Sequence, residues 1–278
     1  MIKTIISGAF IGIANIIPGV SGGTVALLLG VYERLTEAVG EFLTAPKDKK
    51  IEFIKFLSLI FVGAVIGLLG FAKIIGFLYS NYEVETSFFF LGLIVASLPL
   101  VLTHRESTVV TTKGKIWFFI GLSVMIGFTI LKHFYGSGDV EANSGYTMSI
   151  GYSLKLILSG AMAGGAMVIP GISGSLLLVM LGEYYNILGF VNNREIIPIA
   201  FVGIGAILGI VGFAKIIDKL LKSHKDNTLY FIIGLIVGSL IEIWPIFNPI
   251  FTNILINIFT FTLGVVIVKL MTKLEGSK

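Results

Sequence analysis

An apolar segment interrupted by Pro-Gly occurs twice in this chain, once in each half. The first copy reads Ile-Pro-Gly-Val-Ser-Gly-Gly at residues 17–23, and the second reads Ile-Pro-Gly-Ile-Ser-Gly-Ser at residues 169–175. Each copy follows a Ser-Gly-Ala triplet by ten residues, and the matched positions lie 152 residues apart. Duplicated apolar segments with Pro/Gly breaks are typical of membrane proteins built from internal repeats. The pattern therefore predicts a duplicated membrane protein whose site lies at two helix breaks.

Composition supports the membrane class. Of the 278 residues, 55% are hydrophobic and 13% are charged, which leaves too little polar surface for a soluble globule of this size. Several apolar stretches reach the roughly 20 residues that cross a bilayer of about 30 Å, and they lack the period-2 alternation of barrel strands. We expect an all-α polytopic membrane protein. The first segment lacks a signal-cleavage site, so we expect the mature chain to begin near Met1.

The repeat extends beyond the Pro-Gly motif. Gly-Phe-Ala-Lys-Ile-Ile at residues 70–75 returns at 212–217, now 142 residues apart, because the connector after the first motif is about ten residues longer. We expect one membrane domain of two repeats. The first covers 1–135, with a re-entrant segment at 5–31 and transmembrane helices at 53–79, 86–102 and 116–132. The second covers 150–278, with a re-entrant segment at 154–182 and transmembrane helices at 196–217, 229–245 and 254–271.

The distribution of positive charge predicts that the repeats are inverted. If each Pro-Gly segment enters the membrane and returns to the same face, each half makes three full crossings, and the second half is inverted relative to the first. That topology places 15 Lys and Arg residues on the cytoplasmic side and only Lys132, Lys155 and Arg194 outside, whereas a single crossing would move Lys219, Lys222, Lys225 and the C-terminal lysines outside. The positive-inside rule favours the inverted arrangement, with both termini cytoplasmic.

The length of each Pro-Gly segment also fits a re-entrant hairpin. Gly8 to Ile17 is ten residues, or about 15 Å of helix, which is half the hydrocarbon thickness. Pro18 and Gly19 would then break the helix, and Pro170 and Gly171 would do so in the second copy. Irregular backbone at this depth is tolerated only inside protein or beside an aqueous cavity, so we expect the two tips to meet near the midplane.

Such tips suit an anion, and a phosphate best of all. Free peptide N–H groups at a helix start, small residues and hydroxyls together make an anion cradle. The candidate headgroup residues are Ser21, Gly22, Gly23, Thr24, Ser173, Gly174 and Ser175. Asn15 lies three residues before Pro18, where it would either donate to an oxyanion or satisfy a carbonyl freed by the break.

Several charged residues have two interpretations. Lys73 and Lys215 occupy equivalent places in apolar runs, where they would either bind phosphate or extend to the lipid headgroups. Glu33 and Arg34 lack charged counterparts in the second half, and they would form either a coupling site or a solvated ion pair. Glu242 would be a protonatable coupling group or an interfacial residue.

The two motif copies resemble a known family. The residues 12–24, Gly-Val-Tyr-Glu-Arg-Leu at 30–35 and the second copy at 166–175 are similar to the bacterial PopT polyprenyl-phosphate transporters, formerly a domain of unknown function. The resemblance covers essentially the whole chain. It implies a multi-pass protein of the bacterial cytoplasmic membrane that returns undecaprenyl phosphate, the carrier lipid of cell-wall (peptidoglycan) synthesis, from the outer to the inner leaflet. The two motif copies would hold its headgroup.

Residue chemistry is compatible with such a flippase but leaves two rivals open. Alternating access around paired helix breaks would expose one cradle to each leaflet in turn, with a proton or cation as the coupling ion. A secondary transporter for a small water-soluble anion would use the same cradle. A lipid phosphatase would need a nucleophile and acid–base partners, but the motif contains no histidine, paired carboxylate or metal-ligand cluster. We therefore expect no enzyme activity, cofactor, metal or nucleic-acid partner, and the oligomeric state stays open, a homo-oligomer included.

Overall fold

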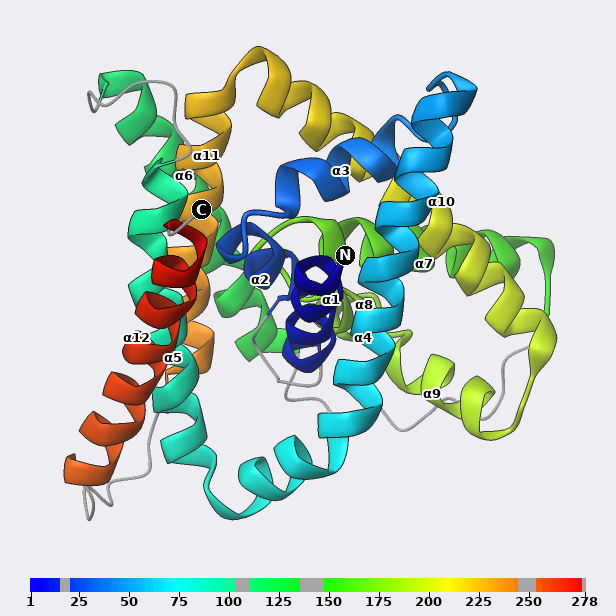
Figure 1. The fold of residues 1–278 in the computed structure, drawn as a ribbon. Helices are drawn as coiled ribbons and strands as arrows, with labels where there is room; N and C mark the ends of the chain where they lie inside the picture. Colours follow the sequence, from blue (N-terminus) through cyan, green and yellow to red (C-terminus); the bar gives the residue numbers. More distant parts are fainter. Residues whose placement is uncertain (16–20, 104–110, 136–147, 245–253, 277–278) are drawn as a thin grey trace.

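The regular secondary structure of the described residues is entirely helical. The computed structural model of the protein describes residues 1–15, 21–103, 111–135, 148–244 and 254–276 (Figure 1). Helices satisfy their own backbone hydrogen bonds, which a lipid environment requires. The first half contains α1 (Ile2–Ala14), α2 (Gly22–Leu28), α3 (Tyr32–Gly40), α4 (Lys47–Asn81), α5 (Glu83–Thr103) and α6 (Thr112–Tyr135). The second half contains α7 (Ile150–Val168), α8 (Gly174–Met180), α9 (Tyr184–Asn192), α10 (Ile196–Ser223), α11 (Lys225–Ile243) and α12 (Ile254–Gly276).

The local structure repeats where the sequence repeats. Ser21 precedes α2 with φ −86° and ψ 131°, and Ser173 precedes α8 with φ −92° and ψ 125°. The turns that follow these short helices both contain a glycine in the left-handed region, Gly30 with φ 65° and Gly182 with φ 71°. An L side chain is strained at such φ values, so the same turn in both halves depends on glycine.

Glycines bring α1 very close to α4. A Cβ atom on Gly8 would lie 2.2 Å from the carbonyl oxygen of Ile60, and one on Gly12 would lie 2.1 Å from that of Ala64. The residue numbers rise together in the two helices, so α1 and α4 run parallel. The second half repeats this packing, with Gly160 against Val202 and Gly164 against Ala206 between α7 and α10. Small residues allow membrane helices to approach this closely.

The remaining long helices pair across the two halves. Helix α5 packs along α12, and α6 packs along α11. Gly92 lies against the backbone of Phe261 in the first pair, and Gly234 lies against that of Phe118 in the second. Each half therefore provides one helix to each pair, and the halves interlock.

The outside of the molecule is strongly apolar. Phe61, Ile207 and Leu255 are 70%, 64% and 83% exposed. Within the described residues, three helical stretches are long and apolar enough to cross a membrane: Lys47–Asn81, Thr112–Leu131 and Ile196–Ser223. Hydrocarbon chains are the environment that such a surface requires. The helical content and this surface together agree with a helical membrane protein.

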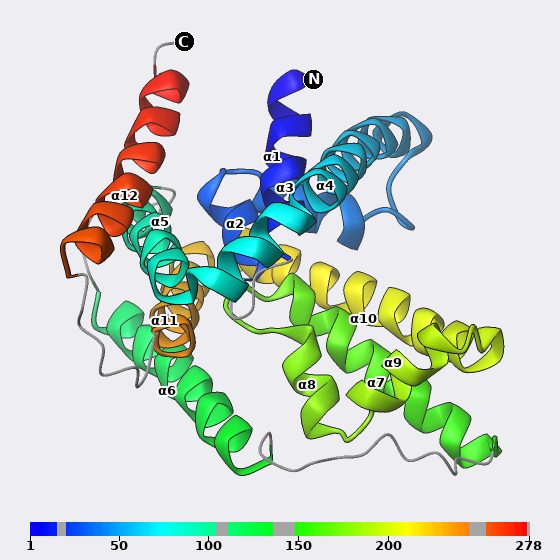
Figure 2. The ribbon, with the colours of Figure 1, turned by 90° about the horizontal axis from the view of Figure 1, so that it is seen from below.

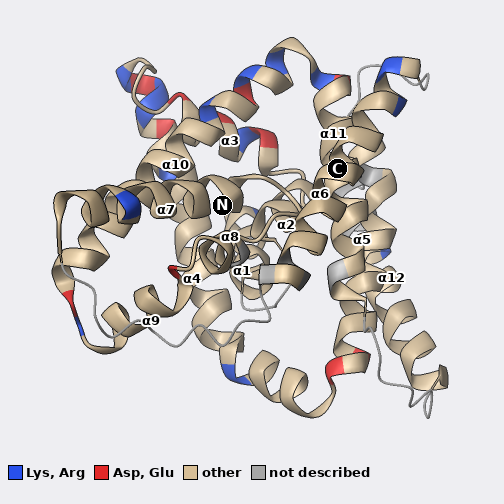
Figure 3. Ribbon diagram, turned by 180° about the vertical axis from the view of Figure 1, so that it is seen from behind, with Lys and Arg blue, Asp and Glu red and all other residues tan. Residues whose placement is uncertain are grey.

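Charged side chains gather at one end of the molecule. Lysine, arginine, aspartate and glutamate cluster around α3, the start of α4, the end of α10 and the start of α11 (Figure 3). The first residues of α1 and the end of α12 lie on the same side of the molecule (Figure 2).

Candidate functional site

The first motif places a polar group beside a glycine that has no room for a side chain. Asn15 caps the C-terminus of α1, and Gly22 begins α2. A Cβ atom on Gly22 would lie 2.7 Å from Oδ1 of Asn15, so the amide occupies the space that a larger residue would need. The neighbouring Ser21 is 8% exposed, and its Oγ has no hydrogen-bond partner among the described residues. A buried hydroxyl without a partner costs roughly 1–3 kcal/mol, which a hydrogen-bonding ligand would recover.

The second motif touches the first directly. The N–H group of Gly171, which has φ +89°, donates a hydrogen bond of 2.9 Å to Oγ1 of the buried Thr24. The hydroxyl of Tyr32, which is also buried, donates a 2.9 Å hydrogen bond to the carbonyl oxygen of Val168 at the end of α7. These two bonds join the break regions of the two halves.

A cavity of about 190 Å³ lies beside this junction. Its volume equals that of several water molecules at about 30 Å³ each, so a small polar group fits. We call it the central cavity. Its polar lining comes from Asn15, Tyr32 and Thr36, with the backbone of Gly22 and Gly23. Its other lining residues are apolar: Ile11, Leu35, Val39, Met167, Val168, Ile210 and Ala214.

Of the residues predicted to bind the headgroup, only Asn15, Gly22 and Gly23 line the central cavity. The hydroxyls of Ser173 and Ser175 bond to each other at 2.8 Å, and Ser175 is exposed. Gly174 is buried against the carbonyl of Ala163, while Pro170 is buried at the second break. Helices α2 and α8 are only seven residues long, so few aligned peptide dipoles contribute at either tip.

Neither predicted lysine lines the central cavity. Lys73 on α4 and Lys215 on α10 are both exposed. The backbone of Lys215 packs against Gly40, where an added Cβ would lie 2.7 Å from the lysine N and Cα atoms.

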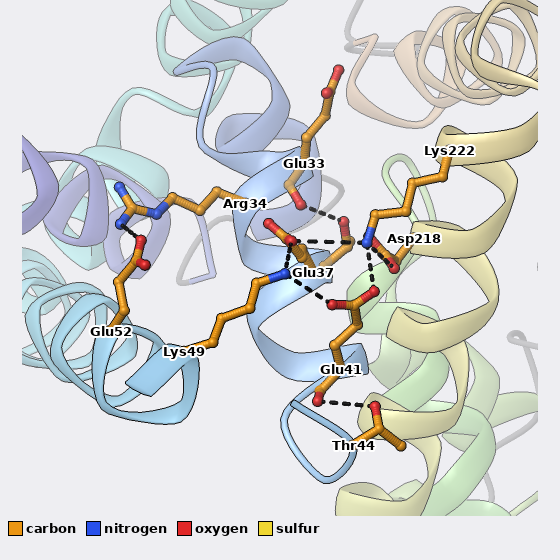
Figure 4. A network of polar contacts seen from close by, with 10 residues as sticks. Glu33, Arg34, Glu37, Glu41, Thr44, Lys49, Glu52, Asp218 and Lys222 are labelled. Atoms are coloured by element: carbon orange, nitrogen blue, oxygen red, sulfur yellow. Dashed lines mark hydrogen bonds and ion pairs between the residues drawn. The ribbon is translucent and has the colours of Figure 1, made fainter. Parts of the chain in front are cut away.

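The predicted coupling residues form ion pairs away from the cavity. The carboxylate of Glu33 lies 3.0 Å from Nζ of Lys225. Arg34 pairs with Glu52 at 2.8 Å (Figure 4), and its Cζ atom lies 4.7 Å from the centre of the Phe56 ring. Pro18, Gly19 and the side chain of Glu242 lie outside the described residues.

Sequence reasoning missed a charged cluster around α3. Nζ of Lys222 lies 2.6 Å from Oε1 of Glu41 and 2.9 Å from Oδ2 of Asp218, while Lys49 contacts Glu37 at 2.7 Å and Glu41 at 3.2 Å (Figure 4). The hydrogen bonds from Lys222 and Lys49 lower the pKa of the Glu41 carboxyl. A signal was present in the sequence, because Glu33, Glu37 and Glu41 recur every four residues on one short helix.

A second polar cluster surrounds the buried carboxylate of Glu183, which precedes α9. Its side chain is 1% exposed and pairs with Lys155 at 2.5 Å. It also accepts hydrogen bonds of 3.0 Å from the Tyr152 hydroxyl and the Asn186 amide. The equivalent residue in the first half is Val31, so this cluster belongs to the second half alone. With three partners, the carboxylate is well satisfied and ties α7 to α9.

Comparison with known proteins assigns the chain to a family. A family model described as undecaprenyl phosphate translocase-like matches residues 11–255. A polyprenyl-phosphate transporter of Vibrio cholerae is 30% identical over 254 residues, covering 88% of this chain and 78% of the relative. A polyprenyl-phosphate transporter of Staphylococcus aureus is 29% identical over 248 residues, covering 87% of this chain and 85% of the relative. No solved structure matches the chain. The match over most of the chain shows that this protein belongs to the undecaprenyl phosphate translocase-like family.

Proposed function

We propose that this protein transports a polyprenyl phosphate, undecaprenyl phosphate in particular, across the bacterial cytoplasmic membrane, and that its headgroup binds where the two motif copies meet. The observation that carries the proposal is the junction itself, where Thr24 of one copy bonds to Gly171 of the other beside the central cavity. Asn15 offers an amide donor there, and the buried Ser21, which caps α2, directly precedes the cavity-lining Gly22. Both relatives are named polyprenyl-phosphate transporters, which supports this class of substrate.

The proposed topology has two inverted repeats, each a re-entrant hairpin followed by three transmembrane helices. The parallel packing of α1 on α4 supports it, because α1 then enters from the same face as α4. The pair α7 and α10 follows the same rule. In Figure 2, α1 and α7 run toward the centre from different sides. The charged end of the molecule would be cytoplasmic by the positive-inside rule.

Transport would follow alternating access from the outer to the inner leaflet. The phosphate needs a polar path through the bilayer, whereas the polyprenyl chain stays in hydrocarbon. Moving one negative charge inward against a potential that is negative inside costs about 2.3 kcal/mol per 100 mV. A co-transported proton or cation would offset this cost. Recycling of the carrier lipid for peptidoglycan synthesis would be the biological role.

Translocation of a labelled polyprenyl phosphate in proteoliposomes tests the proposal. Neutral polyprenol and water-soluble phosphate serve as the comparison substrates. We expect movement of the phosphorylated lipid alone, with a loss of at least tenfold when Asn15→Leu removes the amide donor from the cavity. The control is Ser175→Ala, which changes an exposed hydroxyl outside the cavity and should transport normally.

Two results would contradict the proposal. Uptake of soluble phosphate without lipid movement would replace the lipid with a small anion as substrate. Equal transport by the Asn15 and Ser175 variants would remove the central cavity from the pathway.

A further inference from the structure

Helix α3 separates the central cavity from the charged end of the molecule. Tyr32, Leu35, Thr36 and Val39 recur at helical spacing and line the cavity from one face of α3. The opposite wall at this point belongs to α10, through Ile210 and Ala214. Contact between α3 and α10 therefore closes the cavity on its charged side.

Close backbone packing holds α3 on α10. Gly40 lies against the backbone of Lys215, so close that any side chain would have to displace the helices. In the second half, the residue equivalent to Gly40 is Asn192, which carries a Cβ atom. The helices equivalent to α3 and α10 are α9 and α4. In the described part of the chain, α9 packs on α8 and α10, and α4 is not one of its main neighbours. In the described part of the chain, this close packing is thus found between α3 and α10 and not between α9 and α4.

Ion pairs between the halves reinforce the same contact. Lys222 of α10 reaches Glu41 at 2.6 Å and Glu37 at 3.8 Å (Figure 4). Lys225 of α11 reaches Glu33 at 3.0 Å. We call these three pairs the α3 latch. The positions on α9 equivalent to the three glutamates are Tyr185, Gly189 and Asn193, so the second half has no such latch.

We propose that α3 is the cytoplasmic gate of the transport pathway and that the α3 latch holds it shut in this conformation. This inference rests on the proposed function, because only transport requires the cavity to open toward the cytoplasm. Opening would separate α3 from α10 and break the ion pairs of Lys222 and Lys225. Its symmetry-related counterpart, α9 against α4, would close the other side without glutamates at the equivalent positions of α9.

Spin-label distances between α10 and the turn that directly follows α3 test the gate without any substrate. The chain contains no cysteine, so Thr44→Cys and Lys219→Cys introduce two unique exposed labelling sites. Exposed ion pairs contribute up to about 1 kcal/mol each, so Lys222→Gln should increase the population with long distances roughly three- to tenfold. The control is Lys55→Gln, an exposed lysine of α4 outside the latch, which should keep the wild-type distribution.

Charge reversal separates loss of the ion pair from damage to the fold. Lys222→Glu should open the gate, and adding Glu41→Lys should restore the closed distribution. An unchanged distribution of spin-label distances in both Lys222→Gln and Lys222→Glu would overturn the latch. A double variant with Lys222→Glu and Glu41→Lys that fails to restore the closed distribution would also overturn it.

A reversible cross-link connects the gate to transport. With Glu41→Cys and Lys222→Cys joined by a reducible bifunctional thiol reagent, transport should stop and return after reduction. Full transport by the cross-linked protein would overturn the gate and leave the proposed lipid substrate standing. Conversely, if the protein transports a substrate other than lipid and the same cross-link blocks that transport, the result would overturn the proposed function and support the gate.

Discussion

Replacing Gly67 with alanine should loosen the packing of α1 on α4, whereas the same replacement at Gly70, one turn later on α4, should not. A Cβ atom on Gly67 would lie 2.0 Å from the carbonyl oxygen of Ala9, and one on Gly70 would meet no atom within 4 Å. Real Cβ contacts essentially never fall below 3.0 Å, so the helices must separate locally by at least 1.0 Å, the difference between 3.0 and 2.0 Å.

The two substitutions should therefore have different effects on stability. Alanine is favoured over glycine inside a helix by roughly 0.5–1 kcal/mol, and both variants gain this amount. Overpacking at Gly67 costs about 1–3 kcal/mol, a penalty that Gly70 does not incur. We expect Gly67→Ala to be neutral to destabilising by up to about 2.5 kcal/mol and Gly70→Ala to be stabilising.

Thermal unfolding in one detergent, followed by intrinsic tryptophan fluorescence, measures the difference. The second half repeats the experiment, because a Cβ atom added to Gly209 would lie 2.0 Å from the Ala161 carbonyl oxygen, and one added to Gly212 would meet no atom within 4 Å. Equal shifts of Tm for the two members of either pair would refute the close-packing argument.

Three further outcomes follow from single contacts. Tyr32→Phe loses the hydrogen bond to the Val168 carbonyl and should destabilise the protein by about 1 kcal/mol; an unchanged unfolding midpoint would contradict this. Glu183→Ala removes the ion pair to Lys155 and the hydrogen bonds from Tyr152 and Asn186, and it should cost about 1.5–3 kcal/mol, well above the cost of the less buried Glu195→Ala. A similar Tm for both variants would show that the cluster is not stabilising. Because its partners lower the pKa of Glu41, its ion pairs are fully present above the ordinary carboxyl pKa of 4.5 and are lost as the pH falls below it. The spin-label distances should therefore stay constant from pH 8 to pH 5 and lengthen only in stronger acid; lengthening already near pH 6 would exclude Glu41 as the cause.

Class and local structure could be predicted from the sequence because they depend on short-range chemistry. A largely apolar chain with few charges cannot cover a soluble surface, and helices meet the hydrogen-bonding demand of lipid. The repeated motif dictates repeated turns: Ser21 and Ser173 adopt the same extended backbone before α2 and α8. Gly30 and Gly182 take the same left-handed conformation for the same reason.

Only the tertiary structure decided which polar groups meet. Sequence equivalence suggested that both copies would offer the same hydroxyls, yet Thr24 contacts Gly171 while Ser173 bonds to Ser175. The equivalent of Thr24 is Leu176, which has no hydroxyl group to accept such a hydrogen bond. Long-range contacts depend on both partners, and a repeat in one of them does not determine the other.

The charged cluster of α3 illustrates the same limit. The spacing of its glutamates is a sequence signal for a charged stripe that the sequence analysis did not use. Even with that signal, nothing local to the helix identifies Lys222 and Lys225, almost 200 residues away, as partners. Their meeting depends on Gly40, whose missing side chain lets α3 lie against the backbone of α10. The sequence by itself determined a duplicated helical membrane protein with paired breaks. The difference between its two halves arises from helix packing, because among the described residues Gly40 and three ion pairs hold α3 against α10 and α11.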